Sequence, residues 1–296
     1  MIKFFADTAS LKDIEYCFSR GVNDGITTNP MILKDTGDLS QGMEGACRII
    51  LGKYSGVPVS LETDLRGINV HKLDQVSSKK IKDVLLEQAK ELASYGPNVV
   101  VKIPVCQGGL EAARYLVDQG VRTNITACMT PYQALTAVSA GIGYVSLFAN
   151  RMLDSHILEL SGHSLEKTLK DPHWKDIVKS KKDRHFEEAW TKTLGQIAYV
   201  AQQLDSNPHV GLIVGSIRSP ADIHRLVRAA PQIITIPTKI VEGLVEEGYS
   251  INDLKATART ISDFSDIAIG DSLSHPMTQY TLLEFEMAAD VYRSKL

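Results

Sequence analysis

Lys102 is the side chain whose type and position most strongly suggest chemistry. It lies in residues 98–104, where three valines precede it and Ile103 and Pro104 follow. This run does not alternate apolar with polar residues, so it is typical of a strand buried on both faces. Burial disfavours the charged form of an amine, and a neutral amine can attack a carbonyl. The alternative is a structural lysine that reaches the rim of the fold or pairs with a carboxylate.

Other polar side chains with a related chemical use fall near the ends of further apolar runs. A Schiff base between lysine and a ketone withdraws electrons, so an adjacent carbon–carbon bond can break. One carboxylate can take the hydroxyl proton at that bond, and a second can move protons through a hydroxyl or water. Amides can hold hydroxyl groups, while arginines and a serine can bind phosphate. The candidates are Asp7, Thr28, Asn29, Ser60, Glu62, Asn124, Thr126, Ser146, Phe148, Arg151, Ser216 and Arg218. Together with Lys102 they suggest aldol cleavage and transfer on a phosphorylated sugar.

Eight short apolar runs alternate with longer helical patterns. This alternation predicts parallel strands joined by right-handed crossovers, and eight units in 296 residues predict an α/β fold, the (β/α)8 TIM barrel. An open doubly wound sheet is the alternative, but no Gly-x-Gly-x-x-Gly follows the first run. The predicted strands are residues 2–7, 25–28, 57–62, 98–103, 122–126, 144–148, 210–215 and 233–236.

The helical patterns complete the predicted barrel. No internal repeat, low-complexity tract or linker interrupts them, so residues 1–296 are expected to form a single barrel domain. The predicted helices are residues 11–20, 79–95, 109–119, 132–140, 186–204 and 220–229.

Parallel strands in a barrel bring their C-terminal ends to one rim, where the active sites of this fold lie. Each candidate also has a structural explanation. Asp7 could cap the first helix, Asn29 could hold the turn before a proline, Glu62 could pair with Arg66, and Ser216 could cap the next helix. A ring that holds two carboxylates, a lysine, hydroxyls, amides and two arginines is harder to explain structurally.

Two stretches exceed what a barrel needs. Residues 154–184 follow the sixth strand and are polar, so we expect a lid or small helical insert on the catalytic face. Its histidines show no tight metal-ligand spacing, and we expect neither a metal nor a cofactor. Residues 251–296 follow the eighth strand and suggest a C-terminal helical extension that packs on the barrel or on a neighbouring subunit of a homo-oligomer.

Composition limits the partners and the compartment. The net charge of -3 argues against a general role in binding nucleic acid or membranes. Charges appear early in the first residues, and no stretch is long and apolar enough to span a bilayer. The four cysteines are scattered without zinc spacing. These features predict reduced thiols in a cytoplasmic protein whose partners are small molecules.

Seven segments of the sequence resemble the transaldolase family. They occur in the family's order, and the resemblance covers roughly residues 2–245. The segments are FFADTA (4–9), GITTNP (25–30), VSLE (59–62), VVKIP (100–104), TNIT (123–126), YVSLFANR (144–151) and GSIR (215–218).

The resemblance implies a metal-free Schiff-base mechanism. Lys102 would form the imine, Asp7 would be the acid/base at the cleaved C3–C4 bond, and Glu62 and Thr126 would position the water that relays protons. Asn29, Asn124 and Ser146 would hold the dihydroxyacetone unit, and Arg151, Ser216 and Arg218 would bind the phosphate.

The implied reaction belongs to the non-oxidative pentose phosphate pathway. A transaldolase passes dihydroxyacetone from fructose 6-phosphate or sedoheptulose 7-phosphate to an aldose phosphate.

Some segments depart from the pattern. Met31 stands where the family usually has serine, and Asn150 with Arg151 resembles the aldolase-like subgroup. Glu62 and Phe148 resemble true transaldolases. The alternatives are therefore a fructose-6-phosphate aldolase, a relative acting on another ketose, or a non-catalytic barrel that binds sugar phosphates.

Overall fold

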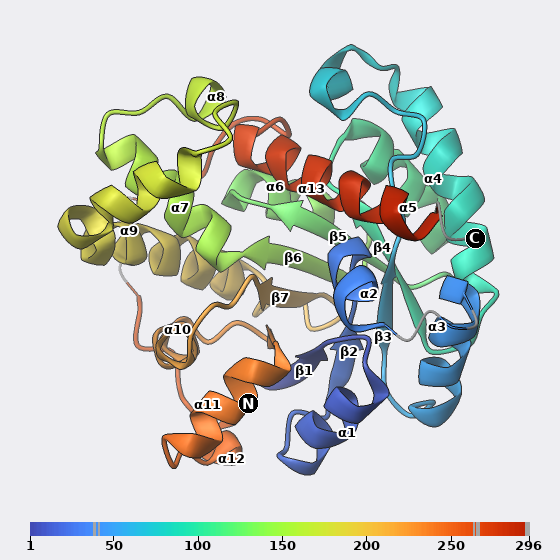
Figure 1. Ribbon diagram of the computed structural model, residues 1–296, viewed down its shortest axis with the longest axis horizontal. Coiled ribbons are helices and arrows are strands. Elements are labelled where there is room, and N and C mark those ends of the chain that lie inside the picture. The colour runs from blue at the N-terminus through green and yellow to red at the C-terminus, as the bar shows by residue number, and fades with distance from the viewer. Residues whose placement is uncertain (38–39, 41, 263, 265–266, 294–296) are drawn as a thin grey trace.

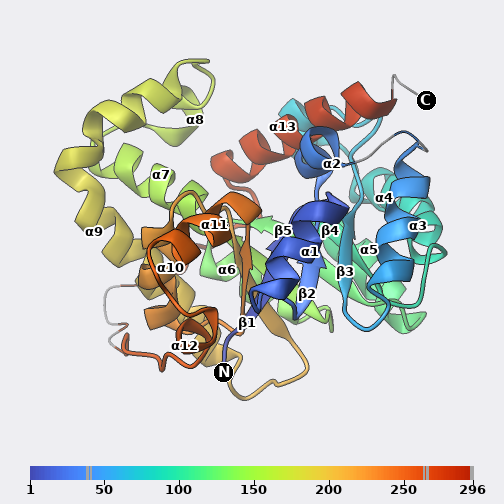
Figure 2. The ribbon, with the colours of Figure 1, turned by 60° about the horizontal axis from the view of Figure 1, so that its bottom comes forward.

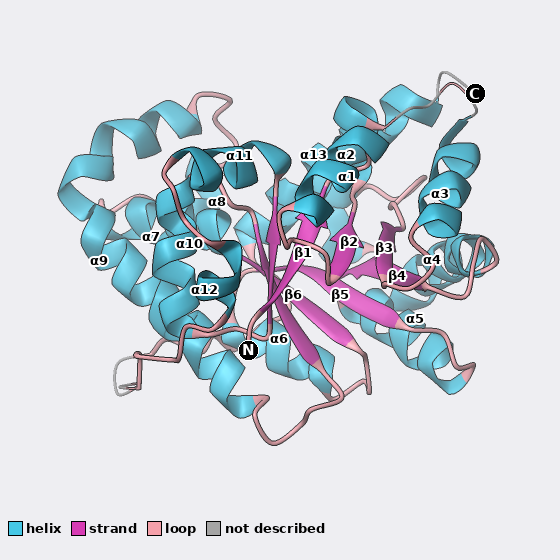
Figure 3. Ribbon diagram, turned by 90° about the horizontal axis from the view of Figure 1, so that it is seen from below, coloured by secondary structure: helices cyan, strands magenta, loops and turns pink. Residues whose placement is uncertain are grey.

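Eight parallel strands close into a barrel, as the sequence predicted. The computed structural model describes residues 1–37, 40, 42–262, 264 and 267–293. Each strand pairs with the next along the chain, and pairing of the first strand with the eighth closes the ring (Figure 3). The strands are β1 (Lys3–Asp7), β2 (Gly25–Thr27), β3 (Val59–Glu62), β4 (Val99–Pro104), β5 (Thr123–Cys128), β6 (Tyr144–Phe148), β7 (Gly211–Gly215) and β8 (Ile233–Ile236).

Helices surround the barrel, and short polar residues begin several of them. Ser10, Ser77 and Thr130 each accept a backbone N–H from the first turn of the helix that follows. Ser10 rather than Asp7 therefore caps the first helix. The helices are α1 (Leu11–Ser19), α2 (Pro30–Thr36), α3 (Gly42–Lys53), η1 (Val70–Gln75), α4 (Ser78–Ala93), α5 (Gln107–Asp118), α6 (Pro131–Val138), α7 (Ala149–Leu160), α8 (Leu165–Thr168), α9 (Trp174–Gln203), α10 (Pro220–Leu226), η2 (Val227–Ala229), α11 (Thr238–Glu246), α12 (Ile251–Lys255) and α13 (Pro276–Arg293).

The barrel interior is apolar at one end and polar at the other. Phe5, Ile213 and Ile233 form a small buried cluster toward the N-terminal ends of the strands. Phe5 lies so close to Gly25 that a Cβ there would stand 2.6 Å from its ring, so this position requires glycine. The apolar plug leaves the polar residues to gather at the C-terminal ends, which is the face where this fold places its sites.

The insert after the sixth strand is a pair of helices joined through a short third one. α7 and α9 pack against each other, and α8 lies at their far end, away from the barrel (Figures 1 and 2). α9 begins at Trp174, well before residue 186, where the sequence predicted a helix. Its densely buried stretch runs from Ala189 to Ala201, whereas most of its first turns are exposed, so the insert extends beyond the barrel wall.

The last helix crosses the mouth of the barrel. α13 lies beside α2 and above the ends of β4 and β5 (Figures 1 and 2). Glu286 accepts a hydrogen bond from the Leu65 N–H at 2.9 Å, and Thr278 donates to the Ala127 carbonyl at 2.9 Å. The predicted C-terminal helix is therefore present and covers the face formed by the C-terminal ends of the strands. Residues 294–296 of the predicted extension lie outside the described residues.

Within the described ranges, the structure has no helix with the length and apolar character needed to span a membrane.

Candidate active site

The C-terminal ends of the strands enclose a cavity of about 330 Å³, which we call the Lys102 cavity. Its wall contains seven of the predicted site residues. These are Asp7, Asn29, Lys102, Ser146, Phe148, Arg151 and Ser216.

Lys102 is buried at this cavity and is held by two acceptors. Its Nζ lies 2.9 Å from Glu62 Oε2 and donates to the Thr28 carbonyl at 3.2 Å. The side chains of Lys102 and Glu62 are 6% and 1% exposed. Strand register explains the pairing, because Glu62, Lys102 and Asn124 are direct partners across three adjacent strands. The carboxylate predicted for Lys102 is thus Glu62, whereas Arg66 donates to Asp64 at 3.0 Å.

Asp7 belongs to a second polar group, at the end of β1. Thr27 Oγ1 donates to Asp7 Oδ1 at 2.6 Å and also contacts the hydroxyl of Thr235. All three side chains line the Lys102 cavity. Thr27 and Thr235 hold the carboxyl of Asp7 in one orientation, with the cavity beside it.

Burial makes both carboxylates better proton acceptors than ordinary ones. Desolvation raises the pKa of Asp7, although the hydrogen bond from Thr27 and the charge of Lys102 oppose the shift. Desolvation also raises the pKa of Glu62, against the opposing charge of Lys102. Raised pKa values on two carboxyl groups beside one buried amine are typical of sites that move protons.

Behind the cavity wall, the barrel interior holds polar atoms without partners. Ser146 Oγ donates to Asn124 Oδ1 at 2.8 Å. The Nδ2 of Asn124 and the Oγ1 of Thr126 are buried and have no hydrogen-bond partner in the described structure. Buried polar groups are nearly always paired, so these two groups leave capacity for a ligand or water.

Three predicted residues also have clear structural roles. Asn29 Oδ1 accepts the Ile32 N–H at 2.9 Å and caps α2, while its side chain lines the cavity. Thr28 Oγ1 donates to the Ser60 carbonyl at 2.8 Å. Thr28 and Ser60 therefore hold β2 against β3 beneath the cavity, and Thr28 presents its carbonyl to Lys102.

The apolar part of the cavity faces the amine. The Phe148 ring centre is 5.8 Å from Lys102 Nζ and 6.2 Å from the ring centre of Phe285 on α13. Phe285 and Thr281 bring α13 into the cavity wall. The last helix therefore contributes directly to the enclosure of the amine.

Arg151 and Ser216 stand at the outer side of the cavity. Arg151 Nη2 is hydrogen-bonded to Glu284 of α13, whereas its Nη1 is buried without a partner. Ser216 has a positive φ of 62°, and its carbonyl accepts from Asn150 Nδ2 at 2.7 Å. Ser219 with Asp222, rather than Ser216, caps the next helix. A strained serine beside a buried guanidinium is consistent with an anion site.

Of the three residues predicted to bind phosphate, Arg218 is the one that does not line the Lys102 cavity. Its guanidinium donates to both oxygens of Asp154, at 2.8 and 2.6 Å. It lines a neighbouring cavity of about 540 Å³, which we call the lateral cavity. Arg151 lines both cavities, so the two cavities adjoin at this residue.

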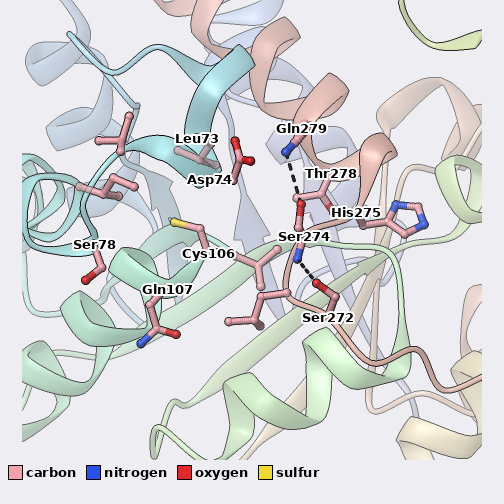
Figure 4. Close-up of a pocket in the computed structure, with 14 residues that line it drawn as sticks. Leu73, Asp74, Ser78, Cys106, Gln107, Ser272, Ser274, His275, Thr278 and Gln279 are labelled. Carbon is pink, nitrogen blue, oxygen red and sulfur yellow. Dashed lines mark hydrogen bonds between the residues drawn. The ribbon is translucent and has the colours of Figure 1, made fainter. Parts of the chain in front are cut away.

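A third cavity, of about 400 Å³, lies between the starts of α4 and α5 and the segment that leads into α13 (Figure 4). Cys106 lines it and caps α5, accepting the Gly109 N–H at 3.3 Å. Burial raises the pKa of the Cys106 thiol to about 11. The thiol is therefore protonated at neutral pH and serves packing.

Sequence reasoning did not include several members of the cavity wall. Thr235 is a hydroxyl in the otherwise aliphatic strand β8, and that contrast was a usable signal. Thr281 and Phe285 gave no such signal, because their place in the site depends on where α13 crosses the barrel.

Comparison with known proteins agrees with this geometry. A family model described as transaldolase/fructose-6-phosphate aldolase matches residues 4–282. The chain belongs to this family. The predicted family is thus confirmed, and membership indicates an enzyme of aldolase or transferase type.

Curated relatives carry the name probable transaldolase, and three of them illustrate the extent of the match. That of Desulfosudis oleivorans is 38% identical over 154 residues, covering 52% of this chain and 63% of the relative. That of Desulforapulum autotrophicum is 29% identical over 244 residues, covering 82% of this chain and 89% of the relative. That of Bdellovibrio bacteriovorus is 28% identical over 255 residues, covering 86% and 94%. The match to the first relative thus spans less than two thirds of its length.

Proposed function

We propose that this protein is a transaldolase that uses Lys102 as its Schiff-base residue. The observation that carries the proposal is the buried Lys102 amine in a cavity, 2.9 Å from Glu62, with the carboxyl of Asp7 lining the same cavity. A structural ion pair alone does not require a cavity or a second carboxylate with a raised pKa.

The reaction begins at the ketone of the donor sugar. Glu62, whose pKa is raised, takes a proton from Lys102, and the free amine attacks C2 of the ketose. Water leaves as the imine forms, and Thr126, with its unpaired buried hydroxyl, helps Glu62 hold that water. The imine is protonated, so it can accept the electrons of the C3–C4 bond.

Cleavage and transfer then use Asp7. Its carboxylate takes the proton of the C4 hydroxyl, the C3–C4 bond breaks, and the aldose phosphate leaves. The dihydroxyacetone unit stays on Lys102 as an enamine, held by Asn29, Asn124 and Ser146. An acceptor aldehyde then forms the new carbon–carbon bond with its C3, Asp7 returns the proton, and water releases the product from Lys102.

The substrate phosphate lies against Arg151 in this proposal. Ser216 reaches it from the Lys102 cavity and Arg218 from the lateral cavity, since Arg151 lines both. The unpaired Nη1 of Arg151 supports this position. The donor is fructose 6-phosphate or sedoheptulose 7-phosphate, which places the reaction in the cytoplasmic, non-oxidative pentose phosphate pathway.

One experiment tests the Schiff base directly. Incubation with fructose 6-phosphate and borohydride should leave a reduced three-carbon adduct on Lys102, located by peptide mass spectrometry. Lys255 is a matched control, because it is also buried and paired with a carboxylate, Asp24, but lines none of the three cavities. Adduct on Lys102 but not on Lys255, abolished by Lys102→Ala, is the expected result. Turnover without any adduct would exclude the mechanism and favour a different class of enzyme.

The nearest alternative is a fructose-6-phosphate aldolase. Phe148 favours transfer, because its phenyl ring beside Lys102 supplies neither a proton donor nor a site to order water. An aldolase would release dihydroxyacetone without an acceptor as fast as it transfers it, and coupled assays with and without glyceraldehyde 3-phosphate distinguish the two. Ligand binding with neither adduct nor turnover would indicate a non-catalytic barrel.

A further inference from the structure

The lateral cavity carries more positive charge than one substrate phosphate requires. It lies between α7, α9 and α10, and six basic side chains line it together with two carboxylates. The whole chain has a net charge of -3, so the positive charge of this cavity is opposite in sign to the net charge of the molecule. The basic side chains are Arg151, Lys175, Lys179, Lys182, Arg218 and Arg225.

Carboxylates already engage most of these cations. Glu284 holds Arg151 and Lys175, Asp154 holds Arg218, and Glu187 holds Arg225. Lys179 and Lys182 are the exceptions, because no carboxylate in the described part of the chain lies within ion-pair distance of either. Lys182 Nζ lies over the ring of Phe186, 4.7 Å from its centre. The positive charge that no carboxylate pairs with is therefore concentrated on two lysines of the insert.

Helix geometry points these lysines toward the same space. Lys175, Lys179 and Lys182 follow the spacing i, i+4 and i+7 on α9, which places them on one face of the helix. All three line the lateral cavity, whereas the neighbouring Lys181 does not.

Buried residues held by hydrogen bonds and packing form the rest of the cavity wall. Asp154 and Asp222 are buried, and Asp222 accepts from Asn150 Nδ2 at 2.7 Å and from the Arg218 N–H at 2.9 Å. Trp174 is buried in the wall and packs edge-on against Tyr280 of α13 at 5.1 Å between ring centres. These contacts fix the buried wall of the cavity, whereas Lys179 and Lys182 are exposed.

We propose that the lateral cavity is a second anion subsite, which binds a phosphate group through Lys179 and Lys182. This extends the proposed function, because Arg151 connects the subsite to the Lys102 cavity. Tetrahedral phosphate suits a pair of flexible ammonium groups backed by guanidinium groups. The third cavity (Figure 4) is a poor candidate for such a group, since no described residue that lines it is Lys or Arg.

Tryptophan fluorescence provides a local test of binding. The chain has two tryptophans, and Trp174 lines the lateral cavity, so Trp190→Phe gives a protein that reports from this cavity. Titration of this protein with inorganic phosphate at low salt should give a saturable change. The double change Lys179→Ala and Lys182→Ala should weaken binding by about tenfold or more. Lys181→Ala is the matched control and should leave binding as it was.

Two results would overturn the subsite. One is binding by the double variant as tight as that of its parent. The other is an equal loss in Lys181→Ala, which would mean a general effect of net charge. Circular dichroism and thermal melting establish that each variant is folded. Because the titration needs no turnover, it stands or fails separately from the adduct on Lys102.

Kinetics distinguish two sources of the phosphate. If it is the terminal phosphate of a longer donor, the double variant raises KM for sedoheptulose 7-phosphate and leaves KM for fructose 6-phosphate unchanged. If it is a separate anion, free phosphate changes the rate with fructose 6-phosphate, and the double variant removes that response. Either result supports the subsite, and the absence of both effects together with unchanged phosphate binding rejects it.

Discussion

The Lys102 cavity and the lateral cavity share Arg151 but are built in opposite ways. Strand ends form the first, and its amine–carboxylate pair is 6% and 1% exposed. Helices of the insert form much of the second, where the side chain of Arg218 is 47% exposed. Strand register fixes Glu62 and Lys102 side by side, whereas long side chains on helices supply charge with less fixed positions. The barrel is thus suited to chemistry and the insert to recognition.

The largest expected effect comes from Asp7 in the strand-built cavity. Asp7→Asn should lower kcat by roughly 10²–10⁴, because an amide cannot take the C4 hydroxyl proton. Steady-state transfer assays measure the loss. Borohydride trapping of dihydroxyacetone, which requires no C3–C4 cleavage, should still label Lys102.

Thr27→Val is the companion variant. It keeps the carboxylate but removes the hydrogen bond that orients it, so a smaller loss is expected. A folded Asp7→Asn protein that transfers at the wild-type rate would remove Asp7 from the mechanism.

The next largest effect distinguishes Arg151, which lines both cavities, from Arg218, which lines the lateral cavity. Arg151→Gln should raise KM for a phosphorylated donor. The expected loss of binding free energy is about 1.5–3 kcal/mol. Arg218→Gln should cost less, because Asp154 already holds both ends of its guanidinium. KM for unphosphorylated fructose should change little in either variant.

Folding must be controlled in this series. Arg151→Gln leaves Glu284 without one of its partners, so Arg151→Gln combined with Glu284→Gln removes that carboxylate too. Equal losses with phosphorylated and unphosphorylated sugars would show that Arg151 serves folding instead of phosphate binding.

A smaller effect is expected at the apolar wall. Phe148→Tyr should increase acceptor-free release of dihydroxyacetone several-fold relative to transfer, because a phenol can donate a proton and order water near Lys102. Phe285→Tyr places a phenol on α13 instead. If both variants act alike, any hydroxyl in the cavity suffices, and the position of Phe148 is not special.

The last effect concerns stability and not activity, at the helix that covers the Lys102 cavity. Desolvation lowers the pKa of His275, at the start of α13, to about 4. The unfolded chain takes up this proton near pH 6.5 and the folded chain only near pH 4, so stability falls as the pH drops between these values. His275→Gln should remove roughly 1–3 kcal/mol of that fall, measured by urea unfolding at pH 7.5 and 5.

An exposed histidine provides the comparison. The side chain of His173 is 80% exposed on the insert, and His173→Gln is the matched exposed control, measured in the same way. Matching behaviour of the two variants would mean that His275 does not set the acid sensitivity of the fold.

Sequence predicted the strand-built part of the molecule much better than the helix-built part. All eight strands were located because runs buried on both faces, such as Val99–Pro104, have a distinct composition. The polar residues at their ends then follow from topology, since parallel strands share one rim. Thus Lys102, Asp7 and Ser146 could be placed at one cavity from the sequence alone.

The helix-built part depends on long-range packing that a local pattern does not contain. The exposed turns of α9 that begin at Trp174 lie in the stretch predicted as a lid or small helical insert, and the start of this helix was not located from the sequence. The pairing of Arg218 with Asp154 joins positions 64 residues apart, and the crossing of α13 is set by contacts with distant loops. Alternatives such as Glu62 with Arg66 were equally reasonable until strand register brought Glu62 to Lys102.

The position of α13 has a consequence for the order of events during synthesis. Its contacts with Leu65 and Ala127 join residues 221 and 151 positions apart, and contacts at such separations form late because loop closure is costly. A growing chain therefore contains every group of the proposed mechanism before it contains the helix that encloses them. Assembly of the proposed site residues and their enclosure by α13 are therefore separate steps. A substitution that delays docking of α13 prolongs a state in which these residues are in place but the Lys102 cavity is uncovered.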